Sequence, residues 1–513
     1  MTLIKCLFAV LFFLSSQSLQ AAPRLVSCQV LNRLPSVLRG ELHGGQVLVV
    51  AEAGYFAKLR IIKNAMPGDT VRMGYFIFEN DYSSSYLVHE MIRQSEKGVK
   101  FQIIVDAAMA EPFKTWLGFI GSQKNIDLRL FRGMSNRFRA FLETELKIAD
   151  PELVWQGLAR QNTKALVQAV MSSPLLMTNI EGIKELIVEA QEPGVNALLL
   201  LQQIGSKLAL SKSLALVGLG EELNEHLYMV SSRFHHKMIL NETPSGLQFV
   251  VGGRNLSDEY HMSVGSPLLA GRSYPFFDAD IAGVIKTSAE KAQMLESFDH
   301  LFLVSEVLKT GALTPEAQTE YLRKVAVFQG QLTTHLANTQ NGSVKLPEQI
   351  EVSYTENKPN PNFQTVAEKQ ILKSWLELIK NSGPEIIIPS AYVFFEPLVI
   401  DALKQAADQG KTITVYTNSF TSTDMNMVNL AMYLMLPKLR ATFGNKLVIR
   451  ELQKDKGQGS LHAKLFSNGT GVLGVGSANF DPRTNNLDSN NSFFVDLSRH
   501  PQVLNQILSR YLN

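Results

Sequence analysis

The sequence predicts an α/β protein of two similar lobes, each a mixed sheet flanked by helices, with one site at their interface. A strand–helix–strand pattern occurs once in each half, and a His-x-Lys stretch follows each copy. The 513 residues are too many for one ordinary core, so two or more lobes are expected. With 45% hydrophobic and 19% charged residues, the chain is typical of a folded globular protein rather than a disordered one.

The first strand–helix–strand copy lies near the N-terminus. Residues 47–65 fit a short strand and a helix, and residues 69–79 form an apolar core strand. Residues 83–97 carry apolar side chains at helical spacing, with Gly98 as the stop. Residues 99–106 then form a second strand. Such a unit implies a parallel strand pair with a right-handed crossover.

The second copy follows the same order late in the chain. Residues 385–388 predict a strand, residues 397–409 a helix that stops at Gly410, and residues 412–417 a second strand. Gly98 and Gly410 occupy matching places. We therefore predict an internal duplication of one α/β unit.

The two copies differ in length before their His-x-Lys stretches. Gly98 lies 137 positions before His235, whereas Gly410 lies 52 positions before His462, a difference of 85 residues. Much of the excess, at about 137–225, has apolar residues at helical spacing and predicts a helical insertion. Polar residues interrupt its apolar runs, so we expect core-packing helices rather than a membrane span. The alternative is a membrane-contacting cap over the site.

The remaining domain limits follow from composition. The first lobe is predicted at 23–330, and residues 331–362, which are polar and rich in Thr, Asn, Gln and Pro, predict a linker. The second lobe is predicted at 363–513 and should begin with a helix at 363–379.

Residues 1–22 have the pattern of a secretory signal peptide. Lys5 precedes the apolar run 7–14, and the small-residue end at Ala21 or Ala22 is the expected cleavage site. The run is too short to span a membrane. We therefore expect a secreted or periplasmic protein.

Charge and cysteine content narrow the function classes. The chain has 49 basic and 47 acidic residues, a balance that does not indicate a nucleic-acid binder. Loss of the signal peptide removes Cys6 and leaves Cys28, so no intrachain disulfide is expected. Cys and His do not cluster at zinc-ligand spacing, and we expect neither a metal nor another cofactor.

Two short stretches of the sequence match each other. Each contains a His, a Lys two residues later, and an Asn behind a pair of small residues. These residues are His235, Lys237 and Asn255 in the first copy and His462, Lys464 and Asn479 in the second. Alternate residues of a strand share a face, so each His and Lys should lie side by side. If the stretches face each other, two imidazoles, two ammonium groups and two amides would surround an anionic phosphate ester.

These residues resemble the HKD-type motifs of the phospholipase D superfamily, His-x-Lys-x4-Asp-x6-Gly-Gly/Ser-x-Asn. The second copy matches at 476–483. Residues 252–260, 417–424 and 277–280 are similar to the bacterial cardiolipin synthase-like branch. The resemblance implies two pseudo-symmetric phospholipase D-like lobes.

The resemblance also implies an activity: a phosphodiesterase or phosphatidyltransferase acting on phospholipid head groups. One imidazole would form a phosphohistidine and the other would protonate the leaving alcohol; by analogy His235 is the nucleophile and His462 the acid/base. The phosphate oxygens would be bound by Lys237, Lys464, Asn255 and Asn479. The product would be phosphatidic acid or a transferred phosphatidyl product such as cardiolipin.

Supporting residues are expected around this set. Asp280 is predicted to orient the first half's imidazole. In the second half the family's Glu falls at Asn490, so either Asp488 substitutes for it or one imidazole lacks a carboxylate. Arg254 could clamp a phosphate or pair with a neighbouring acid. Arg254 and Ser477 complete the predicted substrate-binding residues.

The expected partners are a phospholipid substrate and a membrane surface, and the expected state is a monomer. One alternative is a nuclease of the same superfamily, which should carry clustered basic residues that this sequence lacks. The other is a catalytically weakened lipid- or phosphate-binding protein.

Overall fold

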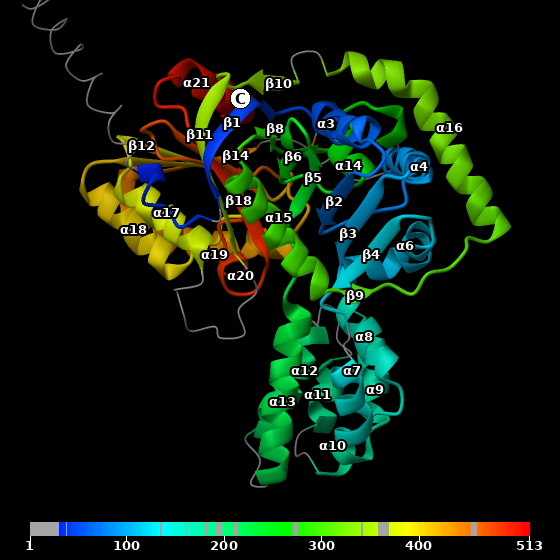
Figure 1. The fold of residues 1–513 in the computed structure, drawn as a ribbon. Coiled ribbons are helices and arrows are strands. Elements are labelled where there is room, and N and C mark those ends of the chain that lie inside the picture. The colour runs from blue at the N-terminus through cyan, green and yellow to red at the C-terminus, as the bar shows by residue number, and fades with distance from the viewer. Residues whose placement is uncertain are drawn as a thin grey trace, which may run out of the picture.

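The computed structural model describes residues 30–36, 38–133, 136–160, 162–179, 183–190, 197–209, 214–269, 275–339, 342–357, 369–452 and 459–512. The predicted signal peptide at 1–22 and Cys28 lie outside these ranges. Within them, one continuous 16-stranded mixed sheet runs through both halves of the chain (Figure 1). The α/β class is confirmed, but the two predicted sheets are joined into one.

The strand order of one half repeats in the other. Outward from the centre, the first half runs β1 (Leu38–Leu48), β8 (Asp280–Ile285), β6 (Gly246–Gly252), β5 (Lys237–Thr243), β2 (Thr70–Tyr75), β3 (Lys100–Asp106) and β4 (Ile126–Phe131). The second runs β11 (Gln349–Asn357), β18 (Asn490–Asp496), β17 (Val472–Gly476), β16 (Leu465–Ser467), β12 (Glu385–Pro389), β13 (Thr412–Asn418) and β14 (Leu447–Leu452). Each half therefore places an antiparallel hairpin beside three parallel strands.

Both predicted strand–helix–strand units are present. Strands β2 and β3 are parallel, with α4 (Tyr82–Glu96) between them in sequence. Strands β12 and β13 are parallel, with α18 (Pro397–Asp408) between them. Gly98 and Gly410 follow these helices at φ values of 103° and 88°. Glycine adopts this left-handed conformation without the steric cost of a Cβ, which explains the helix stop at both places.

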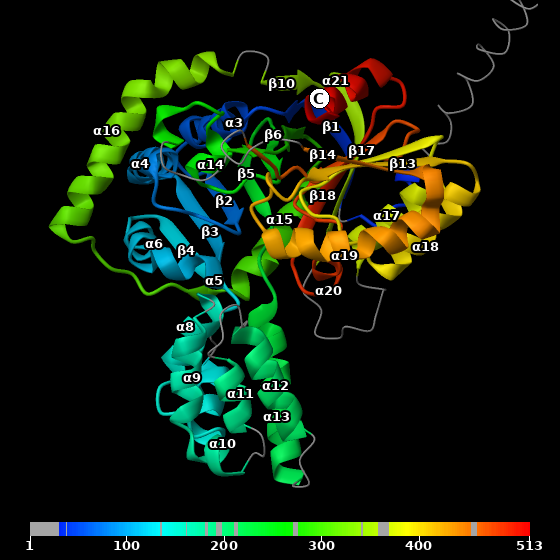
Figure 2. The same cartoon turned by 180° about the vertical axis from the view of Figure 1, so that it is seen from behind.

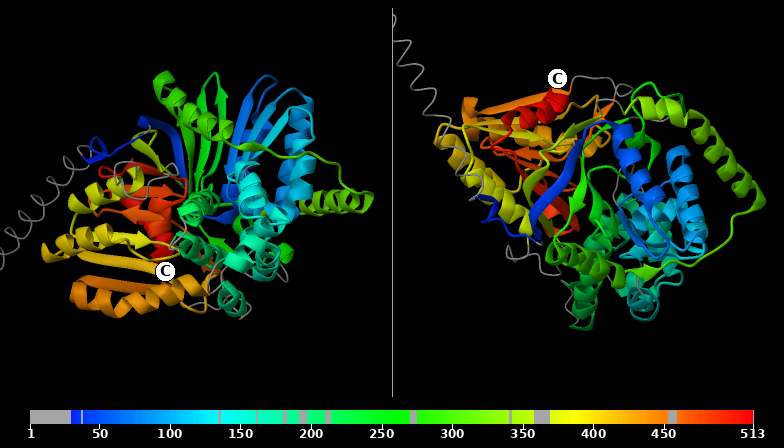
Figure 3. Two further views of the ribbon diagram at one scale, coloured as in Figure 1. Left: turned by 90° about the horizontal axis from the view of Figure 1, so that it is seen from below. Right: turned by 45° about the horizontal axis from the view of Figure 1, so that its top comes forward.

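The predicted linker at 331–362 is wrong where the structure describes it. This stretch holds the end of α16 (Pro315–Ala337), β10 (Ser343–Lys345) and β11. Strand β11 lies between β1 and β18 and so joins the two halves of the sheet (Figure 3). Its polar composition is typical of a linker. A buried strand can carry the same polar side chains, however, when they are hydrogen-bonded. Glu356, for example, is buried and accepts hydrogen bonds from Ser297 and Tyr354.

The N-terminal end of the described chain packs on the second lobe rather than the first. Val30, Leu31 and Leu34 are buried in one core with Ile371 and Trp375. Residues 30–34 therefore contribute to the second half of the molecule, although the sequence placed them in the first lobe.

The helical insertion lies between β4 and β5 and projects from the first half as a separate bundle (Figures 1 and 2). It contains α7 (Asn136–Ala140), a π-helix (Phe141–Glu145), α8 (Pro151–Ala159), α9 (Thr163–Met171), α10 (Pro174–Asn179), α11 (Ile183–Glu189), α12 (Ala197–Ala209) and α13 (Leu214–Ser231). Leu200, Leu201, Ile204 and Leu208 are buried in the bundle's own core, which confirms core-packing helices. Among the described helices, none combines the length and hydropathy needed to cross a membrane.

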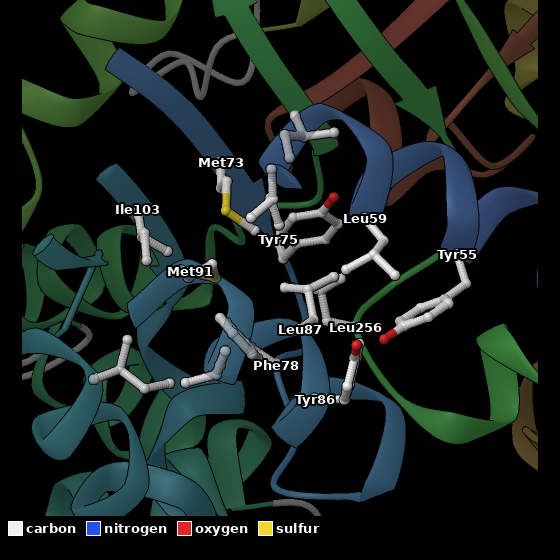
Figure 4. Close-up of a cluster of buried hydrophobic side chains, with 14 of the residues drawn as sticks. Tyr55, Leu59, Met73, Tyr75, Phe78, Tyr86, Leu87, Met91, Ile103 and Leu256 are labelled. Atoms are coloured by element: carbon white, nitrogen blue, oxygen red, sulfur yellow. The ribbon is translucent and has the colours of Figure 1, made fainter. Parts of the chain in front are cut away.

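Helices cover the sheet outside the bundle. Besides α4 and α18, they are α3 (Ala51–Asn64), α5 (Ala107–Ala110), α6 (Lys114–Gly121), α14 (Asp258–His261) and α15 (Ser288–Leu303) in the first half and α17 (Gln370–Lys380), α19 (Asn426–Phe443), α20 (Pro482–Asn486) and α21 (Pro501–Leu512) in the second. Figure 4 shows the first-half core, where Tyr75 and Phe78 lie among apolar side chains of α3 and α4.

A further core contains residues of both halves and fixes their relative position. Phe249 of β6 stacks on Phe493 of β18, with ring centroids 4.8 Å apart. A stacked aromatic pair contributes about 0.5–1.5 kcal/mol beyond the burial of its surface. The halves are therefore joined by hydrogen-bonded strands and by shared apolar packing.

Candidate active site

The two His-x-Lys stretches lie where the halves of the molecule meet. His235 immediately precedes β5, and its backbone N–H donates to Ser489 O of the second half at 2.8 Å. Ser489 N–H donates in return to Arg233 O at 2.9 Å. In the second half, His462 N–H donates to Phe277 O of the first half at 2.8 Å. There, the short strands β7 (Phe276–Phe277) and β15 (Ser460–Leu461) pair in parallel. Each His stretch is thus hydrogen-bonded by backbone to the opposite half.

A carboxylate from the first half orients His462. Its Nδ1 lies 2.6 Å from Asp278 Oδ2, and Asp278 is fully buried. Lys464 Nζ lies 2.7 Å from the same Nδ1 and donates to the His462 carbonyl. Because Asp278 is the acceptor, the proton belongs on Nδ1. This tautomer leaves Nε2, which lies 3.4 Å from the Tyr260 hydroxyl, as the atom for proton transfer.

An amide from the second half orients His235. Its Nδ1 lies 2.7 Å from Asn490 Oδ1. The same oxygen accepts a hydrogen bond from Ser477 Oγ at 3.2 Å, while Asn490 Nδ2 donates to Asp488 O at 3.4 Å. These contacts assign the amide oxygen to the imidazole side. His235 therefore also carries its proton on Nδ1 and presents Nε2 as a nucleophile.

The structure corrects both predicted orienting acids. Asp280 lies 3.3 Å from the Arg254 guanidinium and 3.7 Å from Lys58 Nζ. Asp488 lies 2.9 Å from Arg483 Nη2. Neither carboxylate has a described hydrogen bond to an imidazole. These two assignments failed because they sought each partner within the imidazole's own half, whereas both partners come from the opposite half. The alternative that one imidazole lacks a carboxylate is confirmed, because the Asn490 amide holds His235.

Arg254 and Ser477 are buried and hydrogen-bond residues that hold the two imidazoles. Arg254 is fully buried, donates to Leu48 O at 2.9 Å and bonds Asp278 O. The guanidinium also lies 3.3 Å from Asp280 Oδ2, which confirms the predicted pairing with an acid, whereas the phosphate clamp stays a prediction. Ser477 is also fully buried, and its Oγ bonds Asn490. Ser477 holds the amide that orients His235 rather than facing a ligand.

Two buried ammonium groups give the site positive charge. Lys237 and Lys464 are only 1% and 4% exposed. Lys237 Nζ donates to His235 O at 2.8 Å and lies 5.0 Å from the Phe76 ring centroid. Burial and repulsion from Lys464 hold the pKa of Lys237 well below its usual value, and burial lowers the pKa of Lys464 to about 8. A bound anion would relieve this repulsion, which favours a phosphate ligand.

The two asparagines occupy equivalent turns. Asn255 Oδ1 accepts a hydrogen bond from Ile77 N at 3.2 Å. Asn479 is buried, and its Oδ1 has no hydrogen-bond partner among the described residues. The residue after each asparagine forms a parallel bridge within its own half, Leu256 to Phe78 and Phe480 to Val393. The predicted pairing of the two Asn positions therefore has a structural counterpart.

The two imidazoles differ in basicity because their partners differ. Burial, Lys237 and Lys464 hold the pKa of His235 well below its usual value. Burial and Lys464 also lower the pKa of His462, but Asp278 offsets part of that shift. Burial alone would raise the pKa of Asp278, yet Lys464 and His462 outweigh it and keep the carboxyl ionised. His235 is thus the better neutral nucleophile, and His462 the better proton carrier.

Aromatic side chains surround His462, and the sequence did not single out this grouping. Tyr260 and Phe276 have ring centroids 5.1 Å and 5.0 Å from the imidazole. Tyr392 lies 6.4 Å away. These residues come from both halves, so the sequence did not show that they gather around one imidazole. Asp278 lies within the 277–280 element that the sequence analysis recognised. The fold was needed to tell which of its two acids, Asp278 or Asp280, orients an imidazole.

Within the described residues, no group of three His, Cys, Asp or Glu side chains is placed to hold a metal ion.

Comparison with known proteins gives one family match. Residues 375–512 match the family model described as "Cardiolipin synthase, PLD-like domain". Residues 375–512 are thus similar to a phospholipase D-like domain. The phospholipase D superfamily resemblance is thereby confirmed.

Solved structures extend the likeness to the fold of nearly the whole chain. A phosphatidylserine synthase from Haemophilus influenzae Rd KW20 is 14% identical, with a TM-score of 0.52 over 95% of this chain and 89% of that chain. Nuc, a phospholipase D family member from Salmonella typhimurium, is 17% identical and covers 31% of this chain and 95% of its own, with a TM-score of 0.23. No curated protein matches the chain.

Proposed function

We propose that this phospholipase D-like protein cleaves phospholipid phosphodiesters and passes the phosphatidyl group to water or to an alcohol. The observation that carries the proposal is the exchange of orienting groups between the halves. Asp278 of the first half fixes His462, and Asn490 of the second fixes His235. Both imidazoles are thereby held through Nδ1 and leave Nε2 for chemistry.

The proposed reaction has two steps. Nε2 of His235 attacks phosphorus, the bond to the head-group oxygen breaks, and that oxygen takes a proton from Nε2 of protonated His462. Then His462 removes a proton from water or an alcohol, whose oxygen attacks phosphorus and releases His235. The negative charge on the phosphoryl oxygens is bound by Lys237, Lys464, Asn255 and Asn479.

A membrane surface is the proposed location of the substrate. Large apolar side chains are exposed before and along α19: Phe420 (46%), Met425 (49%), Leu430 (42%) and Leu434 (75%). Exposed apolar groups beside a lipid site favour contact with a bilayer. We further propose that the protein works as a monomer outside the cytoplasm, since residues 1–22 have the pattern of a signal peptide.

The test is incubation with vesicles of mixed phospholipids, with and without a primary alcohol, followed by analysis of the lipid products. Phosphatidic acid alone indicates hydrolysis, and a new phosphatidyl alcohol indicates transfer. His235→Ala and His462→Ala should each remove turnover, while His300→Ala, at an exposed position on α15, serves as the control. Retained turnover in either of the first two variants would refute the two-imidazole mechanism. Cleavage of single-stranded DNA in place of lipid would support the nuclease alternative.

A further inference from the structure

The backbone of Asp278 lies at a break between two strands. Asp278 and Ala279 follow β7 and precede β8, and they belong to neither strand. A buried carbonyl outside a strand ladder needs other donors. The Asp278 carbonyl accepts hydrogen bonds from the Arg254 guanidinium and, at 2.9 Å, from the Tyr511 hydroxyl. Because the Asp278 carboxylate orients His462, the groups that fix this backbone also fix the imidazole.

The side chain of Asp278 has little freedom once its backbone is placed. Its Oδ1 accepts a hydrogen bond from Ala279 N at 2.8 Å, and its Oδ2 lies 2.6 Å from His462 Nδ1. A Cβ added at Gly253 would lie 2.0 Å from Oδ1, so the glycine lets the carboxylate pack directly against the main chain. A rotation of the backbone at Asp278 would therefore carry Oδ2 away from the imidazole.

Tyr511 reaches this carbonyl from α21 of the second half. Leu504, Ile507 and Leu508 of the same helix are buried in the core that both halves share, and Tyr511 packs against that core. These residues precede Tyr511 by seven, four and three positions, so they lie on one face of the helix. Burial raises the pKa of the Tyr511 hydroxyl well above its usual value, so the hydroxyl stays protonated and can donate.

The two donors tie one carbonyl to different halves of the molecule. Arg254 lies just after β6 in the first half, where its guanidinium is also 3.3 Å from Asp280. Tyr511 comes from the second half, as does His462, the imidazole that the carboxylate orients. The contacts therefore run from α21 of the second half to Asp278 of the first half and back to His462 of the second.

We propose that Tyr511 is a positioning residue for the acid/base imidazole: its hydroxyl holds the backbone of Asp278 so that the carboxylate stays on His462 Nδ1. This inference rests on the proposed function, in which His462 protonates the leaving alcohol. Tyr511 acts through Asp278 and not on the substrate. Removal of the hydroxyl leaves the carbonyl its hydrogen bond from Arg254, so we expect the fold to be kept while the carboxylate loses one of the contacts that fix it.

A double-mutant cycle on phospholipid vesicles tests whether Tyr511 acts through Asp278. On vesicles of phosphatidylethanolamine and phosphatidylglycerol, Tyr511→Phe should lower kcat/KM about fivefold, the loss expected for one hydrogen bond. In an Asp278→Asn background the same change should have little further effect, because the carboxylate that Tyr511 positions is gone. Tyr321→Phe is the matched control and should leave kcat/KM unchanged. It removes the hydroxyl of another buried tyrosine, one that has no hydrogen-bond partner among the described residues.

The cycle separates positioning from a general contribution to stability. A purely structural role of Tyr511 would lower kcat/KM by the same factor in both backgrounds, and that result would overturn the proposal. Wild-type kcat/KM in Tyr511→Phe would overturn it as well.

A second experiment needs no turnover and follows the His462 imidazole by NMR. Protein that contains isotope-labelled histidine gives the ring signals, and the signal that disappears in His462→Ala identifies the ring. Burial and Lys464 lower the pKa of His462, and Asp278 raises it again in part. A looser Asp278 should therefore lower this pKa further.

The expected result is a titration midpoint of His462 that is about half a pH unit lower in Tyr511→Phe than in the wild type, in the same direction as in Asp278→Asn. An unchanged midpoint in Tyr511→Phe would refute the positioning role whatever the activity of the protein. A lowered midpoint in a protein that turns over no phospholipid would refute the proposed function and still support the positioning role.

Discussion

Replacing Asn490 by Asp tests whether an amide partner limits the nucleophile. The amide oxygen lies 2.7 Å from His235 Nδ1, and an aspartate can keep this contact. As His235 attacks phosphorus, its ring becomes positively charged, and a carboxylate stabilises that charge more than an amide does. Charge-assisted hydrogen bonds exceed neutral ones by about 1–1.5 kcal/mol. Formation of the phosphohistidine should therefore become roughly tenfold faster in Asn490→Asp.

The same change should move the acid limb of the pH profile. Burial, Lys237 and Lys464 lower the pKa of His235, so the wild-type ring stays neutral and nucleophilic into the acid range. A carboxylate partner raises that pKa, by about one unit for a gain of about 1.4 kcal/mol. The variant should therefore gain rate near neutral pH and lose it earlier as the pH falls.

A chromogenic nitrophenyl phosphodiester makes the measurement clean. Nitrophenol leaves with little help from an acid, so the first burst of colour reports attack by His235 rather than proton transfer by His462. Asn490→Ala is the companion variant and should slow the burst, because the imidazole loses its orienting contact. An Asn490→Asp burst with the wild-type rate and the wild-type acid limb would refute the role assigned to Asn490.

Three further predictions follow from the same geometry. Asp278→Asn should lower phospholipid turnover by about 10²–10⁴-fold but affect the nitrophenyl burst far less, because it weakens the acid, His462, and not the nucleophile, His235. An equal loss on both substrates would contradict this division of roles. The pKa of Lys464 is lowered to about 8, so Lys464 is cationic below that pH and neutral above it. The value of kcat/KM should therefore fall as pH rises through about 8. Lys464→Arg should move this alkaline limb of the pH profile to higher pH. Leu434→Glu should weaken binding to phospholipid vesicles, measured by sedimentation, more than tenfold, since burying a leucine side chain is worth about 1.5–3 kcal/mol. The control Leu322→Glu on α16 should not weaken it. Equal effects of the two changes would place the membrane contact elsewhere.

Local sequence signals predicted the repeated unit well. Each helix is recognised from the apolar periodicity within it and from the glycine that ends it, Gly98 or Gly410. Both signals depend on neighbouring residues only, so the β2–α4–β3 and β12–α18–β13 units could be recognised. The central strand β11 could not. Its polar residues resemble a linker until their hydrogen-bond partners, such as Ser297 for Glu356, are brought beside them by the fold.

The chemical residues of the site were predictable for a similar reason, and their support was not. His, Lys and Asn repeat at close spacing along the chain, which a sequence displays directly. The partners of His235 and His462 come from 255 and 184 positions away, and no periodicity connects them. Asp280 and Asp488 were chosen because each lay in a plausible motif position. Their actual partners are cations, Arg254 and Arg483.

The continuous sheet explains why this exchange of partners can be held so closely. Hydrogen bonds to a ring nitrogen at 2.6 Å and 2.7 Å require the two halves to keep a fixed spacing. Strands β1 and β11 join the halves by a full ladder of pairs, and the stacked rings of Phe249 and Phe493 fill the joint. A flexible linker would let each imidazole lose its partner when the halves moved apart. Because Asp278 and Asn490 differ in charge, the rigid joint also makes the duplicated site unequal, which suits the proposed division between a nucleophile, His235, and a proton carrier, His462.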